Sequence, residues 1–266
     1  MKTLRFIRKL LAVLVHDRVH HPARLAAETC ILVARGGIVL LLYRHVFAWS
    51  GGSINGLGYA PAAWSMFLYF AFSSLRLREL PFAVQEDVRT GNVEVLFSKP
   101  VAYLPYRMGW QLGAGLYPAA VMTLLGGGAL AAGIGLPAPM RTPAFLAGLG
   151  TMVLGGIVLS LLLYALVGLL AFWIEDVSPV YWIVDKLVMI LGGSYLPVAL
   201  LPAVLKNFAT YSPFGASQFL TRTALPGWEQ ESYFLIAIQW GWIAVLAGAV
   251  CLLARIARRK VSINGG

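Results

Sequence analysis

Charged residues are scarce in this sequence. Of its 266 residues only 21 are Lys or Arg and 11 are Asp or Glu, whereas 59% are hydrophobic. A soluble domain has about 25% charged residues, so this chain has too little polar surface to coat a water-soluble core. Disorder is excluded as well, because low hydrophobicity is its precondition. The composition therefore predicts an integral membrane protein.

Motifs for catalysis and cofactor binding are also missing. The sequence contains no GxxxxGK[ST] loop to hold nucleotide phosphates, and neither HExxH nor GxSxG. Its two cysteines, Cys30 and Cys251, lie in separate apolar stretches and offer no disulfide framework or CxxC metal motif. We therefore expect no catalytic residue and no metal or cofactor bound by this chain. If the protein uses ATP, another chain must bind it.

Six apolar segments are present that meet or approach the length of about 20 residues that a membrane-spanning helix needs. They are Leu25–Phe47, Tyr59–Leu75, Leu104–Ile134, Phe145–Ile174, Tyr181–Leu201 and Tyr233–Ala254. With the N-terminus in the cytoplasm, sixteen Lys and Arg fall on the cytoplasmic side and three on the outside, Arg141, Lys206 and Arg222. This asymmetry follows the positive-inside rule. The sequence predicts an all-α integral membrane protein, a single transmembrane domain over 1–266 with six helices and both termini cytoplasmic, and its basic charge indicates contact with anionic lipid, not nucleic acid.

The N-terminal segment 1–20 has apolar residues at helical spacing, Leu4, Ile7, Leu10, Leu11 and Leu14, with basic residues on the rest of the helix circumference. This pattern predicts an amphipathic helix on the cytoplasmic leaflet. The alternative is a frayed basic tail. The apolar stretch 10–15 is too short for the core of a secretory signal, so no cleaved signal is predicted.

The loop 76–100 is unusually acidic, with four of the eleven acidic residues: Glu79, Glu86, Asp87 and Glu94. Residues 85–90 favour a short helix, and Gly91 suits the left-handed position that ends one. An apolar edge follows, formed by Val93, Val95, Leu96 and Phe97. Such an element is suited to docking in a partner's groove. It is equally compatible with a solvated loop whose charges keep it out of the bilayer.

Three runs and one turn occur in order along the chain: EDVRTGNVEVLFSKP at 86–100, IEDVSPVYW at 174–182, GGSYLPVALLP at 192–202 and Ser212–Pro213–Phe214. Their order and spacing around six spans resemble the permease subunits of type-2 ATP-binding cassette (ABC) exporters, of the six-helix viologen-exporter-like or daunorubicin-type family. The resemblance extends over nearly the whole chain. It implies a coupling helix at Glu86–Phe97 that docks on a separate ATPase subunit, which binds ATP and Mg. It also implies a second permease, identical or paralogous, and short re-entrant helices at the outer end in 202–232, where an interfacial loop is the alternative.

The resemblance assigns coupling roles to one group of residues: Glu86, Asp87 and Arg89 for polar contacts, Val93, Leu96 and Phe97 for apolar anchoring, with Gly91 and Glu94 in the same element. The alternative for the polar members is that they cap and solvate the loop. Glu175 and Asp176, in the next cytoplasmic turn, are candidates for a secondary contact or for a polar hinge between spans.

Two ionisable residues are candidates for the substrate path. Arg35 lies ten residues past Leu25, roughly 15 Å along a helix and thus near mid-bilayer. A buried guanidinium there needs a partner or water, so it either pairs with another helix or contacts substrate. Asp185, on the fifth predicted span, is expected to face the same inner cavity between the helices as Arg35.

Together with these features, the resemblance implies a permease subunit that moves an amphiphilic or hydrophobic substrate outward across the cytoplasmic membrane, driven by a partner ATPase. Two other classes stay open. A lipid-modifying membrane enzyme would need His, Asp or Glu clustered at one membrane face. A channel or secondary carrier would not need the docking element at 86–97.

Overall fold

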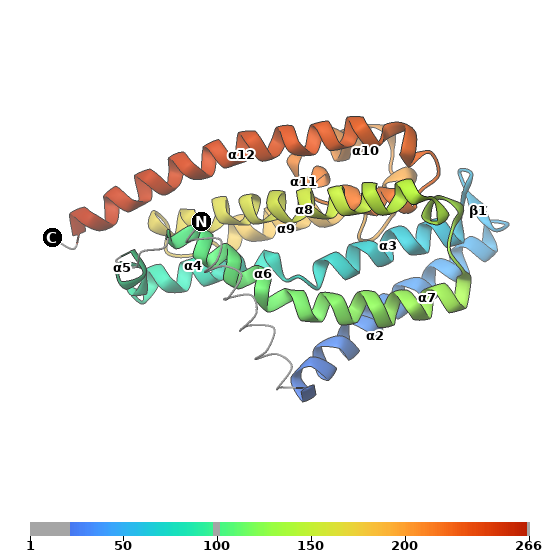
Figure 1. The fold of residues 1–266 in the computed structure, drawn as a ribbon, viewed down its shortest axis with the longest axis horizontal. Helices are drawn as coiled ribbons and strands as arrows, with labels where there is room; N and C mark the ends of the chain where they lie inside the picture. The colour runs from blue at the N-terminus through green and yellow to red at the C-terminus, as the bar shows by residue number, and fades with distance from the viewer. Residues whose placement is uncertain (1–21, 98–101, 265–266) are drawn as a thin grey trace.

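The structure, a computed structural model, describes residues 22–97 and 102–264, and its helices run mostly side by side along the long axis of the molecule (Figure 1). Each of the six predicted apolar segments falls on a helix. These helices are α2 (Pro22–Trp49), α3 (Tyr59–Ser73), α6 with its continuation α7 (Tyr103–Val121, Gly127–Ile134), α8 (Pro143–Leu169), α9 (Ser178–Leu191) and α12 (Trp228–Asn264). The predicted N-terminal helix 1–20 and residues 98–100 of the predicted loop lie outside the described residues.

Short elements connect the long helices. A two-stranded antiparallel hairpin, β1 (Ser53–Ile54) with β2 (Leu57–Gly58), pairs Ser53 with Gly58 and follows α2. The others are η1 (Leu77–Glu79), α4 (Leu80–Arg89), α5 (Asn92–Phe97), η2 (Met122–Gly126), η3 (Ala138–Arg141), η4 (Leu170–Phe172), η5 (Val198–Leu200), α10 (Ala203–Tyr211), α11 (Pro213–Ala216) and η6 (Phe219–Ala224).

The apolar helices support the predicted membrane class. Within the described residues, three continuous helical stretches are long and apolar enough to cross a membrane, 103–134, 143–172 and 228–260, and Gly36–Trp49 is a shorter apolar stretch. The all-α class is therefore confirmed. The number of crossings and the side on which the termini lie stay predictions.

The fifth predicted span, Tyr181–Leu201, is wrong at its C-terminal end. Helix α9 has 14 residues and stops at Leu191. Gly192 donates to the Val188 carbonyl, and Gly193 adopts a left-handed φ of 85° that turns the chain away from the helix axis. Hydropathy continues past this point because the following turn is also apolar, so composition alone did not locate the helix end.

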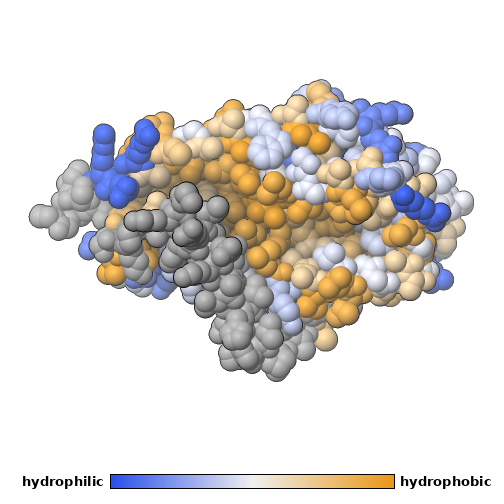
Figure 2. Space-filling view, in the orientation of Figure 1, coloured by the Kyte–Doolittle hydropathy of each residue, from blue (hydrophilic) through white to orange (hydrophobic). Residues whose placement is uncertain are grey.

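Helix α8 occupies the centre of the bundle. In its apolar window 67% of residues are buried, compared with 17% for α6–α7 and 22% for α12. The outer helices therefore present their apolar side chains outward, and Figure 2 shows hydrophobic residues over the middle of one face with hydrophilic ones toward its ends. This distribution fits a molecule whose middle is solvated by lipid chains.

Polar contacts also hold this core together. Gln239 of α12 is fully buried, and its amide donates to the carbonyls of Ala216 in α11 at 2.8 Å and of Met152 in α8 at 3.3 Å. The Trp64 indole of α3 donates to the Gly135 carbonyl at the end of α7 at 2.8 Å. Such bonds fix the rotation of each helix, which apolar packing alone leaves less specified.

The connecting elements gather at two ends of the molecule. Helices α4 and α5 lie at one end with the C-terminal part of α12, whereas the β1–β2 hairpin lies at the other, with α10 toward that side (Figure 1). The predicted inner loop and the predicted outer segment 202–232 are thus set apart along the long axis.

Candidate functional site

Helix α4 is the first component of the site. It begins five residues earlier than the sequence predicted, at Leu80, with Pro81 in its first turn, where a missing backbone N–H costs nothing. It ends at Arg89, Thr90 is its C-cap, and Gly91 takes the predicted left-handed conformation, φ 72°. Because the chain turns at Gly91, the segment Glu86–Phe97 is not the single coupling helix that was expected. It consists of the end of α4 and the separate helix α5.

The inner face of α4 packs directly on α8. Leu80 and Val84 are fully buried. At Gly168 of α8, a Cβ atom would lie 3.1 Å from both the Pro81 Cα and the Val84 Cβ. The absence of a side chain at Gly168 therefore allows the two helices to approach closely, and a displacement of α4 must be passed on to α8.

Asp87 of α4 is the centre of a buried hydrogen-bonded cluster, here called the Asp87 knot, that joins α4, α5 and α6. Its carboxylate, 2% exposed, accepts two hydrogen bonds from the Arg107 guanidinium of α6, one of them at 2.5 Å from Nε. The Tyr103 hydroxyl donates at 2.8 Å and the Asn92 amide of α5 at 3.1 Å. Asp87 is therefore bonded within its own chain, and its contact with a partner stays a prediction. A buried carboxylate requires a matched cation, and Arg107 within the same chain supplies it.

The apolar residues of α5 also face inward. Val93 is 3% exposed and Leu96 5% exposed, and Phe97 packs between the rings of Tyr103 and Phe172 at centroid distances of 5.4 and 6.4 Å. Their side chains thus pack in the chain's own core, and their role as anchors on a partner stays a prediction. Glu94 and Val95 form the outward side of α5.

The turn between α8 and α9, residues 173–177, approaches α4 from the other side. The Val177 backbone N–H donates to the Gln85 side-chain oxygen at 3.0 Å, which ties α4 to the start of α9. Asp176 accepts from the backbone N–H and the hydroxyl of Ser178, at 2.9 and 2.6 Å, and these bonds lower its pKa. Asp176 therefore satisfies the first backbone N–H of α9, and its predicted roles as a secondary contact or a polar hinge stay predictions. Glu175 is exposed beside it.

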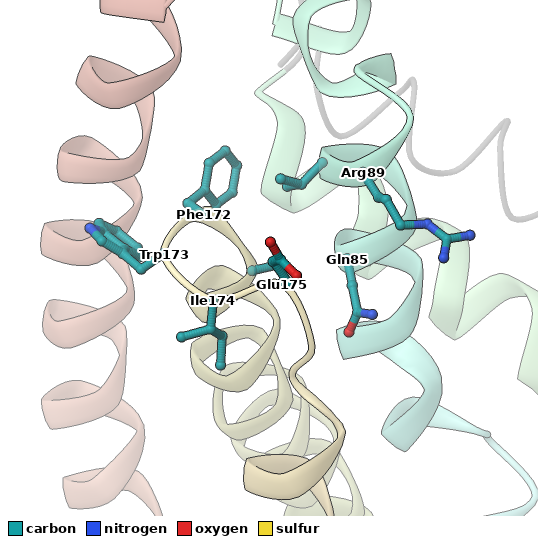
Figure 3. Close-up of a pocket in the computed structure, with 8 residues that line it drawn as sticks. Gln85, Arg89, Phe172, Trp173, Ile174 and Glu175 are labelled. Carbon is teal, nitrogen blue, oxygen red and sulfur yellow. The ribbon is translucent and has the colours of Figure 1, made fainter.

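A cleft of about 430 Å³ separates α4 from this turn. We call it the α4 cleft; its lining residues are Gln85, Val88, Arg89 and Ala171–Glu175. Figure 3 shows Glu175 between the turn and α4, the guanidinium of Arg89 pointing away from the turn, and Trp173 directed toward α12. The sequence placed Arg89 and Glu175 in separate loops, and the fold brings them to one surface.

The chemistry of the α4 cleft suits protein docking. Trp173 is 41% and Ile174 39% exposed. Arg89 pairs with Glu86 at 3.1 Å, but both side chains are well exposed and such a pair contributes little stability. Lys260 of α12 donates to the carbonyl of Phe172, a residue that lines the cleft, at 2.7 Å, so α12 borders one side of the α4 cleft. Exposed apolar residues bordered by charges of both signs are the composition of a protein-binding surface.

The substrate-path candidates have different outcomes. Asp185 is buried on α9 and accepts a hydrogen bond from the Tyr164 hydroxyl at 3.1 Å. The side chain of Arg35 lies outside the described part of the structure. Within the described residues, no group of three or more His, Cys, Asp or Glu is placed to hold a metal ion.

Sequence reasoning missed the residues that position α4. Arg107 was counted only as an inner positive charge, although its place at the start of an apolar span could have indicated a need for a buried acid. Gln85 carried no signal beyond helix propensity.

Most of the chain is similar to one known protein family. A family model described as "ABC-2 family transporter protein" matches residues 37–265, which include both sides of the α4 cleft. No curated protein matches the chain significantly.

Proposed function

This chain belongs to the ABC-2 family of transporter proteins, and from that premise we propose that it is the permease subunit of an ABC exporter whose separate ATPase subunit docks on the α4 cleft. The family makes it a membrane component of an ABC-type transporter. The exporter direction, the cytoplasmic membrane, the second permease copy and the ATPase with its ATP and Mg belong to the proposal.

One observation carries the proposal: α4 is bound to three long helices while its outer side is open. Asp87 connects it to α6 through Arg107, Gln85 connects it to α9 through Val177, and Gly168 admits it against α8. A force applied at the cleft is therefore distributed to three helices at once. This is the property that a transport subunit needs if ATP is hydrolysed elsewhere.

The docking surface differs from the one the sequence predicted. Glu86, Arg89 and Glu175 are its exposed charged members, and Trp173 and Ile174 are its apolar members. Asp87, Val93 and Leu96 support this surface from within. Phe97 is partly buried among them.

The substrate is proposed to be amphiphilic or hydrophobic, moved from the inner leaflet or cytoplasm outward. The helices that surround the core are apolar on their outer faces, so a lipid-soluble molecule can reach the bundle from the side. A lipid-modifying enzyme and a secondary carrier are the competing classes, and both would act without an ATPase.

Charge reversal on the cleft tests the docking. The protein is extracted in mild detergent and the co-purified ATPase is quantified by mass spectrometry. Arg89→Glu and Glu175→Arg should each lower recovery about fivefold, because a rim charge contributes about 0.5 kcal/mol and its reversal replaces this attraction by a repulsion of similar size. Trp173→Ala should lower it further, since aromatic residues dominate interface energies.

Lys206→Glu is the matched control, because Lys206 is an exposed cation on α10, away from α4. It should retain wild-type recovery. Undiminished recovery in all three cleft variants would reject the docking site. Vectorial transport by the purified chain in vesicles, without an ATPase, would reject the exporter itself.

A further inference from the structure

A second cavity, of about 250 Å³, lies between α2, α3 and α9, apart from the α4 cleft. Its lining changes character from one part to another. Ile38, Val39, Phe70 and Met189 contribute apolar surface, whereas Tyr69, Ser73, Arg78, Ser194 and Tyr195 contribute polar groups. A cavity with this lining is suited to a molecule that is itself part apolar and part polar.

Among the described residues that line this cavity, Arg78 in η1 is the only one with a charged side chain. It is partly buried, and no described residue forms a hydrogen bond or an ion pair with it. Burial by itself lowers the pKa of Arg78. The nearby Asp185 carboxylate and tyrosine phenols raise this pKa by a larger amount, so the net shift is upward and the guanidinium stays protonated. A guanidinium has five N–H donors, and donors withdrawn from water without acceptors are costly.

Neighbouring polar atoms are also unsatisfied. The Ser194 hydroxyl, 2% exposed, forms no well-aligned hydrogen bond with a described residue and interacts only weakly with the Tyr69 hydroxyl. On the other side of Arg78, a space of about 20 Å³ is lined by Asp185, Ser160 and Gln218, among others, and the Ser160 hydroxyl is likewise unpaired. That space holds about one water molecule. The larger cavity has room for a ligand.

We infer that this cavity binds an amphiphile with an acidic headgroup, whose carboxylate or phosphate oxygens accept from Arg78 and whose apolar chain lies along Ile38, Val39, Phe70 and Met189. The inference rests on the proposed transport function and names its substrate class. Asp185 opposes the binding. Its carboxylate, held by the Tyr164 hydroxyl, lies within electrostatic reach of Arg78 and reduces the positive potential that the ligand meets.

Binding to the purified chain, without any ATPase, tests the inference. Lysophosphatidic acid and lysophosphatidylcholine with the same acyl chain are compared by native mass spectrometry in nonionic detergent, as are oleate and oleyl alcohol. The acidic member of each pair should bind about tenfold more tightly, and Arg78→Gln should remove that difference. Arg78→Lys, which keeps the charge, should retain most of it.

Asp185→Asn provides a change of opposite sign. The amide can still accept from Tyr164, while the negative charge is lost, so binding of the acidic probe should strengthen several-fold. Arg141→Gln, which removes an exposed cation near the C-terminal end of α7, should leave binding unchanged.

Two results would overturn the inference: equal binding of acidic and neutral probes, or equal losses in Arg78→Gln and Arg78→Lys. Displacement of the acidic amphiphile by millimolar inorganic phosphate alone would also contradict it, because it would identify a site for the free anion. Since no ATPase is present, each of these outcomes is independent of whether docking on the α4 cleft succeeds.

Discussion

The segments α4–α5 and α10–η6 are both short helical connections between long helices, but they bury an arginine in different ways. Near α4, Arg107 meets the Asp87 carboxylate with two hydrogen bonds. In η6, Arg222 donates to the Thr210 hydroxyl at 2.9 Å and lies 4.8 Å from the centre of the Phe219 ring, but it forms no ion pair with a described residue. Burial lowers its pKa to about 10, although the charge of Glu231 offsets part of this shift. The first cation has a directly bonded carboxylate, whereas the second has only a weaker interaction with Glu231. The first connection therefore ties its neighbouring helices together through an ion pair, and the second does not.

The apolar side chains of the two regions also point in different directions. Val93 and Leu96 of α5 are buried in the core, whereas Val204 and Phe208 of α10 are 75% and 61% exposed. Helix α10 thus presents an apolar face outward, as a helix at a membrane interface does. The predicted outer re-entrant role of 202–232 stays a prediction.

The largest expected effect comes from breaking the Asp87 knot. Arg107→Met leaves a buried carboxylate without its cation and should lower the free energy of unfolding by about 3–5 kcal/mol. Thermal unfolding in detergent measures the loss, and limited proteolysis should show that α4 becomes accessible. The double variant Asp87→Asn/Arg107→Met should regain much of the stability. A single variant within about 1 kcal/mol of wild type would show that α4 is held by apolar packing instead.

A steric change tests the packing of the other region. Gly215 of α11 lies so close to α10 that a Cβ atom would stand 2.0 Å from the Ala209 carbonyl oxygen. Gly215→Ala should therefore lower the free energy of unfolding by about 1–3 kcal/mol. Gly128→Ala, at a helical position with nothing within 4 Å, is the control and should be neutral or slightly stabilising. Equal stabilities of the two variants would mean that α10 and α11 separate without cost.

The smallest effect is expected from removing Arg222. Arg222→Met loses one hydrogen bond but also removes a buried charge, so the free energy of unfolding should change by less than about 1 kcal/mol. The same unfolding assay, run beside Arg107→Met, measures the contrast directly. A loss of 3 kcal/mol or more would mean that Arg222 is as well compensated as Arg107, and the distinction between the two regions would be lost.

Much of the fold was predictable from composition and periodicity. The six apolar segments were placed on the six helical stretches, and Gly91 was correctly predicted to end a helix, because a left-handed position strongly favours glycine. The end of the fifth segment was not predictable in this way. Hydropathy does not distinguish a buried apolar turn from a helix, and the turn at Gly192–Gly193 is buried.

The site was predictable as a location but not as a geometry. Acidic and apolar residues in 86–97 marked the correct segment, yet a pattern along one helix cannot reveal which side a neighbouring helix covers. Asp87 and Glu86 are adjacent acids in the sequence, and only the position of Arg107 on α6 makes one buried and the other exposed. The role that we propose for Arg78 was not predictable either, because the sequence does not show which helices surround it.

Helix α12 has a practical consequence. Its 37 residues extend roughly 55 Å, well beyond the hydrocarbon thickness of about 30 Å. Lys260, in its last turns, touches Phe172 beside the α4 cleft. A purification handle fused after α12 would therefore lie close to the α4 cleft. It would lower ATPase recovery by steric hindrance, which could not be told apart from a damaged docking site. Gly51–Gly56, in the exposed hairpin at the far end, offers a safer insertion point for affinity capture.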